Sequence, residues 1–126
     1  ASVHYPGNKF YKLFYNLQAM IAQGHDTVLS FGGAYSNHIH ALAAMGREYK
    51  LSTIGIIRGQ RPQQLSPTLR DAQACGMRLL FLDRQHYKTK DLRPLLPILN
   101  EEYGNYYCLP EGGGHWRIDC TTFSSA

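Results

Sequence analysis

The sequence has no long apolar run and few charged residues. No stretch of about eighteen apolar residues occurs among its 126 residues, which argues against a membrane-spanning helix. No basic segment leads into an apolar stretch, so no signal peptide is visible. Charged residues make up 17% and apolar residues 44%, a balance typical of a soluble globular chain of one ordinary domain.

Cysteine is also scarce and without pattern. The three cysteines, Cys75, Cys108 and Cys120, share no metal-ligand or redox spacing. Their odd number argues against a disulfide framework, so a reducing, cytoplasmic location is expected. His38 and His40 are two residues apart and would not share a helix face, so no metal site is predicted.

The chain is basic, with a formal net charge of +4 and a pI near 9.1. Its 13 lysines and arginines are scattered, and the densest stretch is residues 47–70. A solvated basic surface, or a pocket for one small anion, explains this pattern better than a nucleic-acid groove. We therefore expect neither a nucleic-acid partner nor a membrane partner.

Helical and β-rich segments alternate along the chain. Short β-rich runs predict four strands, at residues 27–31, 51–57, 78–82 and 106–109. Apolar periodicity and capping residues predict helices at residues 9–23, 36–48, 67–74 and 92–103. The alternation predicts an α/β fold, in which a four-stranded, all-parallel sheet has helices on both faces in a Rossmann-like three-layer arrangement. The strand at residues 27–31 should be central in this sheet.

The organisation predicted from these elements has three parts. Residues 1–24 form an N-terminal segment with the first helix, residues 25–113 form the α/β domain, and residues 114–126 form an irregular tail. Pro97 should kink the last helix or move its start, because proline cannot continue a helix interior.

The turn after the first strand is the clearest candidate ligand site. Ligands of such sheets bind beyond the carboxyl ends of the strands, which directs attention to Gly32–Gly33, Arg58–Gly59 and Pro110–Gly113. Backbone amides at the start of the helix that follows Gly33 could bind a carboxylate or a phosphate. The spacing matches neither GxGxxG nor GxSxG. An ordinary strand–helix turn capped by Ser36 is the alternative interpretation.

Lys9 and Lys12 stand at the start of the first predicted helix, where the helix dipole disfavours cations. The simplest interpretation is that both side chains extend into solvent. The alternative is that they serve an anion or a carbonyl group, because a lysine near another cation loses proton affinity and a neutral amine can form a Schiff base.

Two motifs, taken together, resemble a known enzyme family. Residues 7–13, GNKFYKL, resemble the GNKxRKL motif of pyridoxal-phosphate enzymes of the tryptophan-synthase-β fold type, also called fold type II. Residues 30–38, SFGGAYSNH, resemble the GGxxSNH/Q motif of the branch that holds 1-aminocyclopropane-1-carboxylate deaminase and D-cysteine desulfhydrase. Residues 68–72 and Pro110–Gly113 continue the likeness, which implies the smaller α/β domain of that fold type.

The resemblance implies a role for each matching residue. Lys9 matches the lysine that holds pyridoxal phosphate covalently, and Lys12 matches a residue near the cofactor phosphate. Asn37 matches the asparagine that hydrogen-bonds the pyridine 3'-oxygen. Ser36 matches the serine that contacts the substrate and assists ring opening in the deaminase. The amides of Ser36, Asn37 and His38 match the site of the substrate carboxylate.

The sequence also departs from the family pattern. Tyr11 stands where the motif usually has arginine, and His38 stands where the deaminase is expected to have glutamine. Family members have a large domain, with the glycine-rich phosphate loop, that finds no counterpart after Gly113. The chain on its own is therefore expected to be inactive.

The resemblance implies elimination or ring opening of a small amino acid, giving ammonia and a 2-oxo acid, with D-cysteine desulfhydrase-like chemistry preferred. The alternative is a truncated, non-catalytic α/β domain that forms oligomers or binds a small anion. A homo-oligomer is expected in either case, because the apolar stripe of the first helix would otherwise be exposed.

Overall fold

The computed structural model describes residues 11–109. Three of the sequence predictions concern residues outside this range, namely the role of Lys9, the loop Pro110–Gly113 and the tail 114–126.

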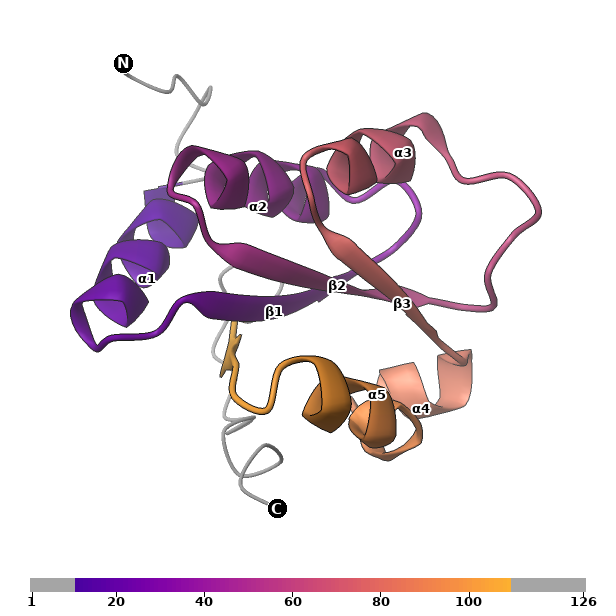
Figure 1. Ribbon diagram of the computed structural model, residues 1–126. Helices are drawn as coiled ribbons and strands as arrows, with labels where there is room; N and C mark the ends of the chain where they lie inside the picture. Colours follow the sequence, from indigo (N-terminus) through magenta and orange to yellow (C-terminus); the bar gives the residue numbers. More distant parts are fainter. Residues whose placement is uncertain (1–10, 110–126) are drawn as a thin grey trace.

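Four parallel strands form one sheet (Figure 1). They are β1 (Thr27–Gly32), β2 (Ser52–Arg58), β3 (Arg78–Leu82) and β4 (Tyr107–Cys108), in the spatial order β3-β2-β1-β4. Every residue of β1 is buried, as expected for a parallel strand covered on both faces. The all-parallel sheet and the internal position of the first strand confirm the sequence prediction.

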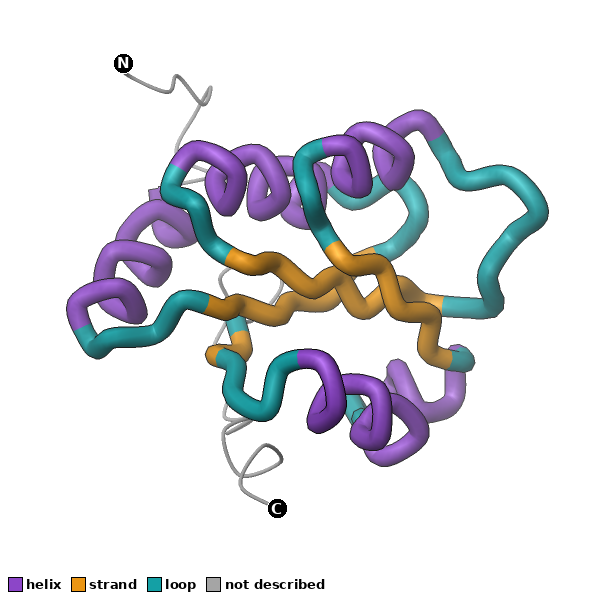
Figure 2. The backbone as a smooth tube through the Cα atoms, in the orientation of Figure 1, coloured by secondary structure: helices purple, strands orange, loops and turns teal. Residues whose placement is uncertain are grey.

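Helices cover both faces of this sheet (Figures 1 and 2). On one face lie α1 (Tyr11–Ala22), α2 (Asn37–Glu48) and α3 (Pro67–Ala74). On the other lie α4 (Arg84–Lys88), the 3-10 helix η2 (Arg93–Leu95) and α5 (Leu96–Glu102). The two faces have separate apolar cores, one centred on residues such as Ile39 and Leu42, the other on Phe31 and Leu99. The three-layer arrangement is therefore the predicted one.

The segment between β3 and β4 differs from the prediction. The helix α4 was not predicted from the sequence. Asp83 caps it by accepting a hydrogen bond from the backbone amide of His86 at 3.2 Å. The single helix expected over residues 92–103 is divided into η2 and α5. Pro97 is the second residue of α5, a position at which its missing N–H costs nothing, so it moves the start of the helix rather than kinking it.

The helix α1 packs against its own sheet. Leu17 and Met20 have no exposed surface and belong to the same core as α2. Ile21, which belongs to the same apolar stripe, is 38% exposed, so the stripe is buried only in part among the side chains that the structure describes.

One expectation about cysteine is wrong. Cys75 has a free thiol, as expected. Cys108, in β4, is disulfide-bonded. The expectation of reduced cysteines therefore fails at this position.

Candidate functional site

The strand order creates a switch point at β1. The chain passes from β1 to β2 on one side, through α2 on the first face of the sheet, whereas β4 joins the other side of β1 after α4 and α5 on the second face. The connections on the two sides of β1 thus diverge, and a ligand site in such a sheet lies at the carboxyl ends of the diverging strands. Here those ends are the glycine turn that follows β1 and Leu109, which follows β4.

The two glycines of the turn that follows β1 have different surroundings. A Cβ atom on Gly32 would lie 2.5 Å from Ile39 Cγ1 and 2.7 Å from Ser36 Oγ, so only glycine allows α2 to begin this close to the sheet. A Cβ atom on Gly33 would meet only Arg58 Nη2, at an ordinary 3.6 Å. Arg58 is the last residue of β2, and its exposed guanidinium has no acidic partner within residues 11–109.

Ser36 is the N-cap of α2. Its Oγ accepts a hydrogen bond from the amide of Ile39 at 3.1 Å, and its carbonyl oxygen accepts one from the amide of His40 at 3.2 Å. The amide of Asn37 has no acceptor in the described part of the chain. The first turn of α2 has no acidic residue, so nothing there neutralises the positive end of the helix dipole. A small anion, such as a carboxylate, suits this terminus.

A buried hydroxyl joins the site to both sides of the switch point. Ser30, in β1, has no exposed surface, and its Oγ lies 2.6 Å from His38 Nε2 in the first turn of α2. The same hydroxyl donates to the carbonyl oxygen of Leu109 at 2.9 Å. The amide of Leu109 in turn donates to the carbonyl oxygen of Leu29 at 2.8 Å. Ser30 is thus bonded to α2 and to the chain that leaves β4.

A second hydroxyl, that of Ser66, is hydrogen-bonded to the glycine turn at Ala34. Ser66 Oγ donates to the carbonyl oxygen of Ala34 at 2.5 Å and accepts from the amide of Leu69 at 3.1 Å, which makes Ser66 the N-cap of α3. The loops that follow β1 and β2 leave the sheet on the same side (Figure 2), and this hydroxyl connects them.

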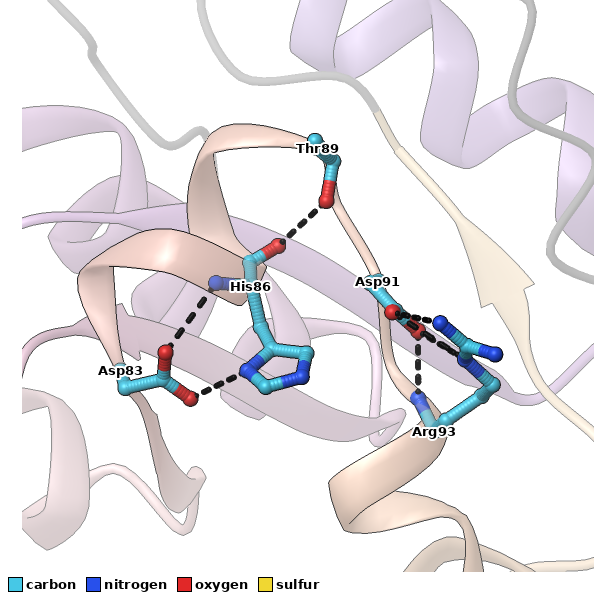
Figure 3. Close-up of polar contacts among 5 residues, drawn as sticks. All are labelled: Asp83, His86, Thr89, Asp91 and Arg93. Atoms are coloured by element: carbon cyan, nitrogen blue, oxygen red, sulfur yellow. Dashed lines mark hydrogen bonds and ion pairs between the residues drawn. The ribbon is translucent and has the colours of Figure 1, made fainter.

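Two carboxylates that follow β3 are paired locally (Figure 3). Asp83 Oδ1 lies 2.5 Å from His86 Nδ1, and hydrogen bonds from the His86 amide and ring lower the pKa of Asp83. Asp91 accepts three hydrogen bonds from the side chain of Arg93, at 2.6–3.1 Å, which help to lower the pKa of Asp91 to about 2. Neither carboxylate pairs with Arg58.

The structure brings together three of the predicted site residues. Ser36, Asn37 and His38 occupy the cap and first turn of α2, where Asn37 is exposed and the other two are partly exposed. Lys12 is the second residue of α1, and Lys9 lies outside the described residues.

Neither Ser30 nor Ser66 was predicted to have a role in the site. For Ser30 a signal existed, since it is a polar residue in the middle of an otherwise apolar β-rich run. Its partners, however, lie 8 and 79 residues away, and no local pattern reveals them.

Other kinds of site find no support between residues 11 and 109. No three His, Cys, Asp or Glu side chains in this range are grouped as a metal ion would require. No helix in it is long and apolar enough to cross a membrane.

Comparison with known proteins finds relatives of this chain. No family model matches the chain. Two proteins named "Putative 1-aminocyclopropane-1-carboxylate deaminase" are similar to it: the one from Pyrococcus abyssi is 27% identical over 107 residues and the one from Thermotoga maritima is 30% identical over 111 residues. The alignments cover 85% and 86% of this chain but 32% and 35% of the relatives, so the chain spans about a third of their length.

A solved structure agrees with these matches. The crystal structure of an ACC deaminase homologue is 26% identical and superposes with a TM-score of 0.67, over 85% of this chain and 33% of that one. The four-stranded α/β fold is therefore one that also occurs in an ACC deaminase homologue.

Proposed function

We propose that this chain forms the small α/β domain of a pyridoxal-phosphate enzyme that resembles 1-aminocyclopropane-1-carboxylate deaminase and D-cysteine desulfhydrase. The observation that carries the proposal is the position of Ser36, Asn37 and His38, which match the family motif, on the first turn of α2 at the switch point. The similarity to the deaminase relatives supports the same family. A small amino acid is the proposed substrate.

The donors at the start of α2 fit the ligands that this family would bring. We assign the carboxylate of the amino acid to the amides of the first turn, because no acid competes for them there. The Ser36 oxygen is engaged by the Ile39 amide, so its hydroxyl proton is what the side chain can offer a ligand. Asn37 is exposed and has an amide group that can donate to an oxygen of the cofactor ring. Pyridoxal phosphate, when bound, acts as an electron sink.

Titration with 1-aminocyclopropane-1-carboxylate, followed by amide NMR shifts, tests the carboxylate site. We expect the largest shifts at Asn37 and His38, and no comparable shifts with cyclopropylamine, which has the same ring and amine but no carboxylate. Equal responses to the two compounds, or shifts confined to other elements, would contradict the proposed site.

A second candidate function is a non-catalytic domain that binds a small anion. The guanidinium of Arg58 beside Gly33, which has no acidic partner between residues 11 and 109, favours it, since arginine binds carboxylate and phosphate groups well. Inorganic sulfate would then shift the same amides as strongly as the amino acid, and removing the amine from the ligand would not weaken binding.

A further inference from the structure

We infer that Ser30 is a positioning residue of this site, whose hydroxyl fixes the His38 ring as the Nε2–H tautomer and bonds it to the carbonyl group of Leu109. The inference rests on the proposed function for the identity of the ligand, but the hydrogen bonds themselves belong to the chain alone. It goes beyond the family motif, which assigns Ser30 no role.

The direction of the two hydrogen bonds follows from the single proton of the hydroxyl. Leu109 contributes a carbonyl oxygen, which can only accept, so the Ser30 proton is donated to it at 2.9 Å. Ser30 Oγ must then accept at its 2.6 Å contact with His38 Nε2. In the neutral ring Nε2 therefore has the proton, and Nδ1 is the acceptor nitrogen.

Because the Ser30 side chain is buried, losing either of its two hydrogen bonds costs free energy. Ser30 has no exposed surface, so water does not replace a lost partner easily. A buried polar atom without a partner costs more free energy than a hydrogen bond between partners usually contributes. We therefore expect the two bonds to form together and to orient the ring of His38 within a narrow range.

The two hydrogen bonds of Ser30 connect the two chain segments that border the proposed ligand site. His38 is in the first turn of α2, where the proposed substrate carboxylate binds, and Leu109 is where the chain leaves β4. Ser30 thus holds the two edges of the switch-point site at a fixed separation. Glutamine at position 38 could keep this bond, because its side-chain amide also supplies an N–H.

The tautomer is measured directly by correlating the ring nitrogens and carbon-bound protons of His38 in the ¹⁵N-labelled full chain. A pH of about 8 keeps an ordinary histidine neutral. We expect a protonated Nε2 and an unprotonated Nδ1 in the wild type and in Ser30→Thr, which keeps the hydroxyl. Ser30→Ala should give a mixture of both tautomers. An Nδ1–H tautomer in the wild type would overturn the inference, and this measurement does not depend on whether the alanine variant folds.

Ser52→Ala is the matched control. It removes the hydroxyl of an exposed serine on the neighbouring strand β2 and should leave the His38 tautomer unchanged. An unchanged tautomer in a folded Ser30→Ala protein would also overturn the inference.

Ligand binding tests the positioning role. We expect Ser30→Ala and His38→Ala each to weaken the binding of 1-aminocyclopropane-1-carboxylate about three- to tenfold, as the loss of one hydrogen bond does. His38→Gln should retain affinity to within about twofold, and the double alanine variant should bind no worse than either single one. Wild-type affinity in Ser30→Ala would refute the positioning role. Absence of binding in the wild type would refute the proposed function instead, and the tautomer would then decide the inference.

Discussion

Gly32 and Gly33 are adjacent in sequence but differ in what surrounds them. A methyl group at Gly32 would be forced against Ile39 and Ser36, at 2.5–2.8 Å, whereas one at Gly33 would have ordinary room. We predict that Gly32→Ala lowers the free energy of unfolding by about 1–3 kcal/mol, the usual cost of overpacking. Urea denaturation measures this effect.

Gly33→Ala is the control for this prediction. Its backbone does not require glycine, so the substitution should leave the stability unchanged or raise it by up to about 1 kcal/mol. A loss of stability equal to that of Gly32→Ala would show that the close approach of α2 is not the cause.

The pairing of Asp91 with Arg93 predicts how the stability of the fold depends on pH. Hydrogen bonds from Arg93 lower the pKa of Asp91 from 3.8 to about 2. A lowered pKa means that the ionised carboxylate stabilises the fold above about pH 4, and that this contribution is lost as the pH falls toward 2. A carboxyl-carbon NMR titration should give a midpoint near 2, and Arg93→Gln should return it toward 3.8. A midpoint that Arg93→Gln does not change would exclude this pairing in solution.

At the scale of secondary-structure elements, Ser66 stabilises both α3 and the glycine turn that follows β1. It caps α3 through the Leu69 amide and bonds the carbonyl oxygen of Ala34 in the glycine turn. We predict that Ser66→Ala lowers the free energy of unfolding by about 1–2 kcal/mol. Hydrogen exchange should become faster in the first turn of α3, and Ser52→Ala should change neither quantity.

The elements predicted well from the sequence are those that local chemistry specifies. The bounds of α3 follow from Pro67 at its start and Gly76, with a φ of 101°, just past its end. The helix α4 was missed because five residues are too few to show a helical period, although Asp83 is a good capping residue. In the site, the cap at Ser36 was predictable from its neighbours, whereas the bonds of Ser30 depend on how α2 and β4 pack against β1.

At the scale of the whole molecule, the sheet separates two apolar cores, and the candidate site lies at its carboxyl edge. In the apolar stripe of α1, Leu17 and Met20 are buried in one of these cores, whereas Ile21 is 38% exposed. Formation of a homo-oligomer stays a prediction, which sedimentation at micromolar concentration can check.

We propose that the chain is part of a pyridoxal-phosphate enzyme of the kind that it resembles, and that Lys9 would hold the cofactor. The most direct test is to incubate the full chain with pyridoxal phosphate, reduce it with borohydride, and locate the label by peptide mass spectrometry. We predict a label concentrated on Lys9, lost in Lys9→Ala and retained in Lys88→Ala, which removes an exposed lysine on α4. A label spread over several lysines, with the same yield in Lys9→Ala, would contradict the account.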